Sequence, residues 1–321
     1  MSARDEAMER GDVPPAPGSR ERSARGARKP EWLKVRAPGG EGYARLLDLT
    51  RRLELNTVCQ EARCPNIGDC WRGPHATMTI MVLGEQCTRR CRFCAVETAA
   101  QGRPPDPAEP ARVAEAIAAL GVGYVVIPSV DRDDLPDGGA AHYAQCIRAI
   151  RERSPQILVE ALIPDYLGAD LATLLQAAPD VLAHNVEVVD RLQRKIRDPR
   201  CSFERSLGTL RGARALLPQV LTKSSLMLGL GESTEEIDDA LVRLRAAGVD
   251  LLTLGQYLRP SPRHAPVREF VRPERFAELA ERGRALGFRH VAAGPLVRSS
   301  YRAGEILATE LLRARRDPHT G

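Results

Sequence analysis

The chain is 321 residues long, which is enough to bury a large core in one barrel-type domain of about 200–250 residues with extensions. Its net charge is +5 and aromatic residues make up only 4%, so the sequence lacks the basic face and the aromatic-interleaved basic runs of a nucleic-acid-binding protein. No stretch approaches about 18 consecutive apolar residues, so we expect no membrane span.

Residues 1–30 are polar and lack the apolar core of a secretion signal. They also carry acidic residues, which transit peptides avoid. We therefore predict a disordered, solvated tail over residues 1–30 of a cytoplasmic protein, and a bacterial chain is favoured over an organellar one.

Six of the eight cysteines fall between positions 59 and 94. Clustered thiols in a reducing compartment indicate metal or redox chemistry, whereas a disulfide framework would suit a shorter, secreted chain. Cys146 and Cys201 stand alone. A lone cysteine is usually a buried small hydrophobe, so neither is assigned a role.

One cysteine group, CQEARCPNIGDC, lies in an N-terminal extension predicted over residues 31–76. It places Cys59, Cys64 and Cys70 on one loop, where Pro65 and Gly68 allow a turn that brings the three sulfurs together. A structural zinc knuckle is the alternative, but neither gap between these cysteines matches a usual zinc spacing.

A repeated βα pattern follows and predicts an α/β fold, a partial (β/α)6 TIM-type barrel over residues 77–293. Helices are predicted over residues 107–120, ending at Gly121, and over 233–248, with Ser233 or Thr234 as N-cap. The extensions at 31–76 and 294–321 are predicted to cap the barrel mouth. The expected strands are 77–84, 124–129, 156–162, 180–187, 220–228 and 249–257, and a further run at 288–296 either extends the barrel or leads out of it.

The other cysteine group, CTRRCRFC, directly follows the first predicted strand, at the end of a barrel where catalytic loops lie. Cys87, Cys91 and Cys94 fit three irons of a [4Fe-4S] cube, because soft thiolates suit such clusters. The fourth iron is then free to bind a small molecule. A zinc site with a distant fourth ligand is the alternative.

The CxxxCxxC spacing resembles the signature of the radical S-adenosylmethionine (SAM) superfamily. Both cysteine groups together resemble the lipoyl synthase family, from Lys29 to about Gly304. The motifs that carry this resemblance are TVCQEARCPNIGDCW, CTRRCRFCAV, SVDRDDLPDGGA, AHNVE, LTKSSLMLGLGE, LGQYLRPSPRHAPV and GPLVRSSY.

The resemblance implies two [4Fe-4S] clusters and SAM as cofactors. The cluster on Cys87, Cys91 and Cys94 would generate a 5'-deoxyadenosyl radical from SAM. Cys59, Cys64 and Cys70 would hold an auxiliary cluster that donates sulfur, with a serine of the RSSY motif as fourth ligand. Ser300 is favoured as that catalytic ligand, and Ser299 is the alternative. The implied reaction inserts sulfur at C6 and C8 of a protein-bound octanoyl-lysine.

Candidate SAM-binding residues lie where predicted strands end. Each has a structural alternative, since glycines at strand ends are more often turns and DLPDGG can simply start a helix. By position and by resemblance the candidates are Gly138, Gly139, Asn185, Glu187, Lys223 and Gly231.

The family implies an octanoylated lipoyl carrier protein as substrate. It also implies an electron donor such as ferredoxin or flavodoxin, and an iron–sulfur carrier that rebuilds the auxiliary cluster. We expect a monomer with no nucleic-acid or membrane partner. Two other functions stay open: a different radical SAM enzyme with an auxiliary cluster, and a non-catalytic iron–sulfur or zinc-binding protein.

Overall fold

A parallel six-stranded sheet organises the protein in the computed structural model, which describes residues 29–72 and 78–300. The strand order is β10-β9-β8-β7-β6-β5, so each strand lies beside its neighbour in sequence, as in a βα barrel. The predicted α/β class is confirmed. The strands are β5 (Tyr124–Pro128), β6 (Leu158–Leu162), β7 (Val181–Ala183), β8 (Leu221–Leu228), β9 (Leu251–Gln256) and β10 (His290–Gly294).

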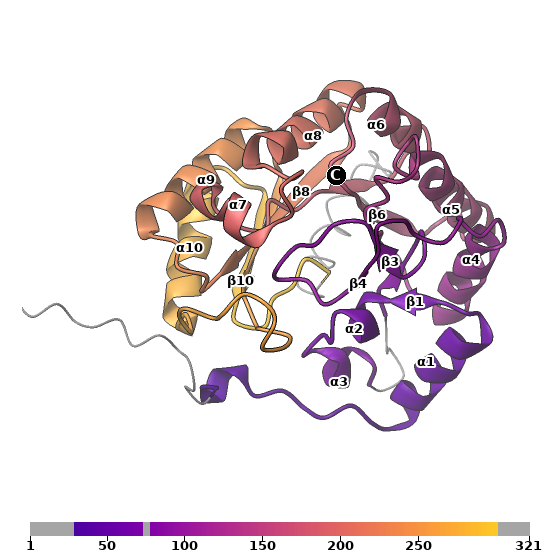
Figure 1. The fold of residues 1–321 in the computed structure, drawn as a ribbon, viewed down its shortest axis with the longest axis horizontal. Coiled ribbons are helices and arrows are strands. Elements are labelled where there is room, and N and C mark those ends of the chain that lie inside the picture. Colours follow the sequence, from indigo (N-terminus) through magenta and orange to yellow (C-terminus); the bar gives the residue numbers. More distant parts are fainter. Residues whose placement is uncertain (1–28, 73–77, 301–321) are drawn as a thin grey trace, which may run out of the picture.

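Helices cover the outer face of this sheet in an arc (Figure 1). The predicted helix ends are confirmed at Gly121, a left-handed C-cap with φ 64°, and at Ser233, whose side chain accepts a hydrogen bond from the Glu236 amide in a capping box. The covering helices are α4 (Glu109–Leu120), α5 (Ala140–Arg153), α6 (Gly168–Leu175), α8 (Phe203–Leu216), α9 (Thr234–Ala246) and α10 (Pro273–Ala285).

The first predicted strand, 77–84, is much shorter than expected. Within its described part, residues 78–84, only β2 (Ile80–Met81) forms, antiparallel to β1 (Asn56–Thr57), and Val82 makes a single parallel bridge to Ser129 beside β5. The extended backbone ends there because Leu83 and Gly84 adopt φ of 69° and 84°. At the other edge, the run predicted at 288–296 joins the sheet as β10.

The N-terminal segment closes the side where the two ends of the helical arc come apart (Figure 1). Its elements are η1 (Glu31–Leu33), α1 (Glu41–Arg52), α2 (Val58–Glu61) and α3 (Ile67–Cys70). Trp71 is fully buried beneath them and contacts Tyr43, with ring centroids 5.2 Å apart. The tail predicted over residues 1–30 falls almost wholly on residues 1–28, which lie outside the described part of the chain.

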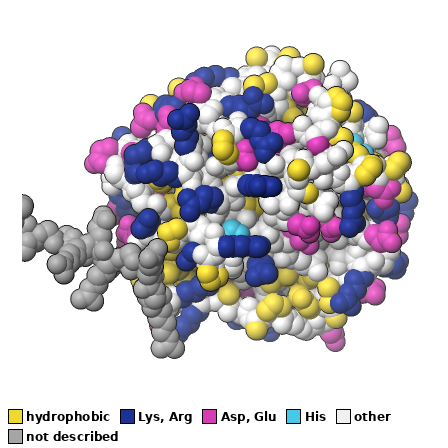
Figure 2. Space-filling model, in the orientation of Figure 1, with side chains coloured by type: hydrophobic (Ala, Val, Ile, Leu, Met, Phe, Trp, Pro, Cys, Tyr) yellow, Lys and Arg dark blue, Asp and Glu magenta, His cyan; other side chains and the backbone are white. Residues whose placement is uncertain are grey.

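β3 (Gln86–Cys87) and β4 (Glu97–Thr98) lie inside the arc (Figure 1). Two further short elements are η2 (Asp190–Leu192) and α7 (Gln193–Ile196). Basic and acidic side chains are interspersed over the face shown in Figure 2 rather than gathered by sign. Within residues 29–72 and 78–300, no helix combines the length and the apolar character that a bilayer crossing needs.

Candidate metal centres

The loop from Cys87 to Cys94, called the first loop below, begins at β3 inside the arc (Figure 1). Backbone N–H groups point at two of its sulfurs: the Arg89 amide lies 3.4 Å from Cys87 Sγ, and the Asp198 amide lies 3.3 Å from Cys91 Sγ. His264 Nε2 lies 2.9 Å from the Cys94 carbonyl oxygen. Hydrogen bonds to sulfur ligands orient them and tune the metal they hold.

Burial raises the pKa of Cys87 and Cys94, so these thiols stay protonated unless a cation binds them. It raises the pKa of Cys94 to about 11. Burial, with Asp131 adding to it, raises the pKa of Cys87 to about 12. These half-buried thiols therefore need nearby positive charge to become thiolates, and bound iron supplies such charge.

The spacing of the sulfurs disfavours a single zinc ion. Among the described cysteines, no three Sγ atoms lie within 4.8 Å of one another. Tetrahedral zinc with Zn–S bonds of about 2.3 Å holds its sulfurs about 3.8 Å apart. The donor set, three thiols on one loop, fits an iron–sulfur cluster.

A buried arginine that the sequence analysis did not single out ties this loop to the barrel. Arg89 is 5% exposed and pairs with Asp131 at 3.2 Å, Asp133 at 2.9 Å and Asp165 at 2.7 Å. These acids follow β5 and β6, so the ion pairs fix the loop to two strand ends. The signal in the sequence was a pair of arginines inside the cysteine motif, together with the acids of the distant DRDD run at residues 131–134.

Cys201 also belongs to this site, although its isolation in the sequence left it without a role. It is buried, its side chain interacts with that of Cys91, and Arg89 Nη1 donates to its sulfur at 3.3 Å. Proximity to Cys91 arises from the fold, since 110 positions separate the two residues and no motif connects them.

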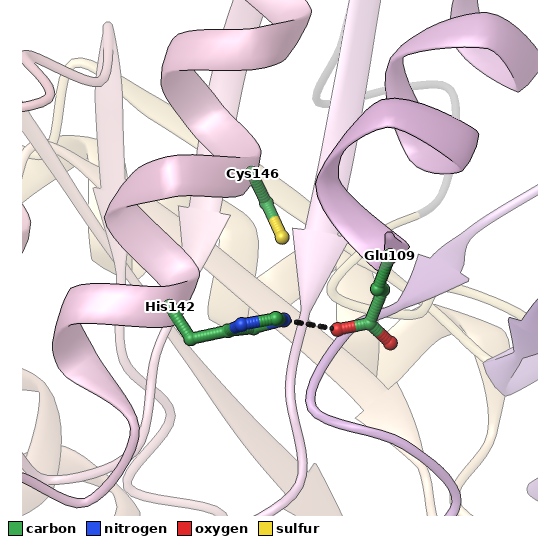
Figure 3. Close-up of side chains that lie close together, drawn as sticks. All are labelled: Glu109, His142 and Cys146. Atoms are coloured by element: carbon green, nitrogen blue, oxygen red, sulfur yellow. Dashed lines mark hydrogen bonds and ion pairs between the residues drawn. The ribbon is translucent and has the colours of Figure 1, made fainter. Parts of the chain in front are cut away.

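Glu109 anchors the turn that leads into the cysteine loop. Its carboxylate accepts hydrogen bonds from the Leu83 amide at 3.0 Å and the Gly84 amide at 3.3 Å, and His142 Nε2 lies 2.7 Å from Oε2 (Figure 3). The Cys146 sulfur lies within 4.8 Å of both side chains, so the three are of metal-binding type. Because the carboxylate oxygens already serve the backbone turn, we interpret this group as a hydrogen-bonded anchor.

The second loop carries Cys59, Cys64 and Cys70 and spans the short helices α2 and α3. The Cys64 amide donates to the Cys59 carbonyl at 3.1 Å. Burial raises the pKa of both thiols. Gly68 is required for the turn, because a Cβ there would lie 2.2 Å from the Arg36 carbonyl oxygen.

The C-terminal segment, residues 296–300, contacts this second loop. Asn66 Nδ2 donates to the Leu296 carbonyl at 2.8 Å. Arg298 lies close enough to Cys64 to lower the pKa of that thiol against the larger effect of burial. Arg298 of the RSSY motif thus lies at the cysteine loop, while Tyr301 lies outside the described residues.

Two of the candidate SAM-binding residues lie beside the first loop. Asn185 Nδ2 donates to Glu187 Oε1 at 3.1 Å, whereas Asn185 Oδ1 is buried with no hydrogen-bond partner in the described structure. Glu187 raises the pKa of Cys94, after the larger effect of burial, so its carboxylate lies near that thiol. An orphaned buried acceptor is what a ligand-binding residue leaves before its ligand is present.

The other candidates have protein partners. Gly138 (φ 59°) offers its carbonyl to the Tyr166 hydroxyl at 2.9 Å, and Gly139 (φ 84°) is the N-cap of α5, which is the structural alternative for DLPDGG. The Gly231 carbonyl accepts from Arg191 at 2.7 Å. Lys223 pairs with Glu160 at 2.9 Å.

Two family models match the chain. Residues 81–244 match the radical SAM superfamily, and residues 17–64 match the N-terminal domain of lipoyl synthase of the radical SAM family. Lipoyl synthase 1, chloroplastic, of Populus trichocarpa is 56% identical over 89% of this chain and 77% of its own length. The Arabidopsis thaliana chloroplastic lipoyl synthase is 53% identical over 89% of this chain and 74% of its own length.

Solved structures share the fold at low sequence identity. Methylornithine synthase (PylB) is 12% identical with a TM-score of 0.52, covering 74% of this chain and 80% of PylB. The FeFe-hydrogenase maturase HydG from Carboxydothermus hydrogenoformans is 14% identical with a TM-score of 0.52, covering 74% of this chain and 65% of HydG.

The relatives contradict the prediction of a cytoplasmic protein. Those from Populus trichocarpa and Arabidopsis thaliana are both named chloroplastic, which points to a plastid. The prediction relied on acidic residues within 1–30, and these are only a compositional signal against a transit peptide.

Proposed function

Because the chain belongs to the lipoyl synthase family of radical SAM enzymes, we propose that its two cysteine loops hold two [4Fe-4S] clusters with separate tasks. In this proposal the enzyme inserts sulfur at C6 and C8 of an octanoyl-lysine on a lipoyl carrier protein. The observation that carries it is the pair of three-thiol loops in one chain. The loop of Cys59, Cys64 and Cys70 is met by the segment that leads into the RSSY motif.

Cys87, Cys91 and Cys94 would hold the first cluster. Bound with SAM, such a cluster supplies a 5'-deoxyadenosyl radical that removes hydrogen from an unactivated C–H bond. The chain's part is to orient the three sulfurs with the Arg89 and Asp198 amides. The orphaned Asn185 oxygen and the Glu187 carboxylate would accept hydrogen bonds from SAM.

Cys59, Cys64, Cys70 and Ser300 would hold the auxiliary cluster and release its sulfur to the substrate. A hard serine oxygen is a weaker partner than thiolate for soft iron, so this bond is suited to open first. Gly138, Gly139, Lys223 and Gly231 are less well supported as SAM contacts, since each already serves the protein's own structure.

The partners follow from the same chemistry. They are an octanoylated lipoyl domain, a low-potential electron donor such as ferredoxin or flavodoxin, and a carrier that rebuilds the auxiliary cluster. An enclosed apolar slot for the octanoyl chain is part of the proposal, as is a monomeric enzyme.

Anaerobic reconstitution tests this function. The protein should take up about eight irons, as two [4Fe-4S] clusters require. With SAM, a reductant and an octanoyl-lysine peptide, it should form 5'-deoxyadenosine and a peptide that has gained sulfur. Uptake of about four irons, or a peptide that gains no sulfur, would contradict the proposal.

A further inference from the structure

A buried ion pair crosses the inner face of the sheet. Glu160 on β6 is fully buried and Lys223 on β8 is 3% exposed, and Lys223 Nζ lies 2.9 Å from both carboxylate oxygens. The Tyr124 hydroxyl also donates to Glu160. Burying two charges is costly unless both are well paired, so this arrangement indicates a specific use.

Lys223 also contacts the C-terminal segment. Its Nζ donates a third hydrogen bond to the Ser299 carbonyl oxygen at 2.6 Å, so all three N–H donors have protein acceptors. A lysine that bound SAM would keep a donor for it. This geometry turns Lys223 toward the C-terminal segment instead.

The segment bound by Lys223 contacts the barrel on one side and the second cysteine loop on the other. Val297 packs directly on β9, where a Cβ at Gly255 would lie 2.2 Å from the Val297 carbonyl oxygen. Asn66 of the second cysteine loop holds Leu296 at 2.8 Å. Residues 296–299 therefore run between the inside of the barrel and that loop, and Ser300 is the next residue.

We propose that Glu160 and Lys223 are positioning residues for sulfur transfer: they fix the backbone of Ser299 so that Ser300 reaches the Cys59, Cys64 and Cys70 loop. This inference rests on the proposed function, because it takes Ser300 as the fourth ligand of the auxiliary cluster. It assigns Lys223 to the auxiliary site and removes it from SAM binding.

The test is Lys223→Met, with Lys34→Met as the matched control, since Lys34 is exposed and its ammonium pairs with Glu31 at the surface. Loss of the tether should cut sulfur insertion into an octanoyl-lysine peptide by about a hundredfold, the scale expected of a displaced reacting group. Formation of 5'-deoxyadenosine should stay within about twofold of the parent, because the first loop is untouched.

A second variant guards against misfolding, because Lys223→Met leaves the Glu160 charge buried and unpaired. The double change Glu160→Leu with Lys223→Met removes both charges and should give the same split between the two products. Loss of 5'-deoxyadenosine in parallel with sulfur insertion would overturn the inference in favour of SAM binding. Unchanged sulfur insertion in both variants would overturn it as well.

A spectroscopic measurement decides the inference independently of activity. In protein whose Cys87, Cys91 and Cys94 are changed to Ala, only the auxiliary cluster should assemble. Mössbauer spectra should show one iron subsite with an oxygen ligand, and Lys223→Met in this background should abolish that subsite. Its persistence would contradict the positioning role, whereas a parent enzyme that adds no sulfur would contradict the proposed function alone.

Discussion

The two cysteine loops are held in different ways. The loop at 87–94 is tied to the barrel through Arg89 and its three acids, and through the Asp198 amide. The loop at 59–70 is built from two short helices and meets the C-terminal segment through Asn66. The first site is thus part of the scaffold, whereas the second depends on segments from the two ends of the chain. This difference fits the proposal that the cluster on the 59–70 loop is the one that gives up sulfur.

The largest expected effect comes from Cys91→Ser in the scaffold-held loop. Serine oxygen is a poor ligand for soft iron, so 5'-deoxyadenosine and the sulfur-containing peptide should both fall below detection. Cys146→Ser is the control, since Cys146 lies on α5, outside both loops, and should leave both products measurable. Substantial 5'-deoxyadenosine from the Cys91 variant would break the assignment of this loop.

Arg89→Met should lower stability most strongly. Removing the guanidinium takes the buried partner from Asp131 and weakens the pairing of Asp165, which keeps only Arg205. Breaking a buried pair in this way costs up to about 3–5 kcal/mol of unfolding free energy. Urea unfolding of the cluster-free protein measures this loss. Arg90→Met, at an exposed position in the same motif, should stay within about 0.5 kcal/mol of the parent. Equal effects of the two changes would mean that Arg89 does not tie the loop to the barrel.

Gly68→Ala should affect the second loop alone. The added Cβ would meet the Arg36 carbonyl oxygen at 2.2 Å, and such overpacking costs about 1–3 kcal/mol. We expect less sulfur in the peptide with near-parental 5'-deoxyadenosine, measured together by mass spectrometry. Gly208→Ala is the control, because its Cβ would make an ordinary contact of 3.5 Å with Leu167. A fall in 5'-deoxyadenosine matching that of sulfur would show that the loops are not independent.

Asn66→Asp should give the smallest effect. It removes the donor to the Leu296 carbonyl, a hydrogen bond worth about 1 kcal/mol, while keeping the size of the side chain. The ratio of 5'-deoxyadenosine to transferred sulfur should rise several-fold. An unchanged ratio would show that this bond does not help to place the segment.

Periodicity and cysteine spacing predicted the βα order, the helix ends at Gly121 and Ser233, and the two three-thiol loops. The predicted strand at 77–84 was too long because no local pattern indicates the left-handed backbone at Leu83, which the remote Glu109 carboxylate stabilises. Cys201 beside Cys91 and Lys223 beside Ser299 were also missed or assigned elsewhere. Such pairs are created by tertiary folding across long stretches of chain, so local patterns do not reveal them.

The division of labour between the loops is tested most directly by comparing two triple variants, one with Cys59, Cys64 and Cys70 changed to Ala and the other with Cys87, Cys91 and Cys94 changed to Ala. Each is reconstituted and given SAM, a reductant and an octanoyl-lysine peptide. We predict 5'-deoxyadenosine without sulfur insertion from the first variant, and neither product from the second. Sulfur insertion by the first variant, or 5'-deoxyadenosine from the second, would contradict the account.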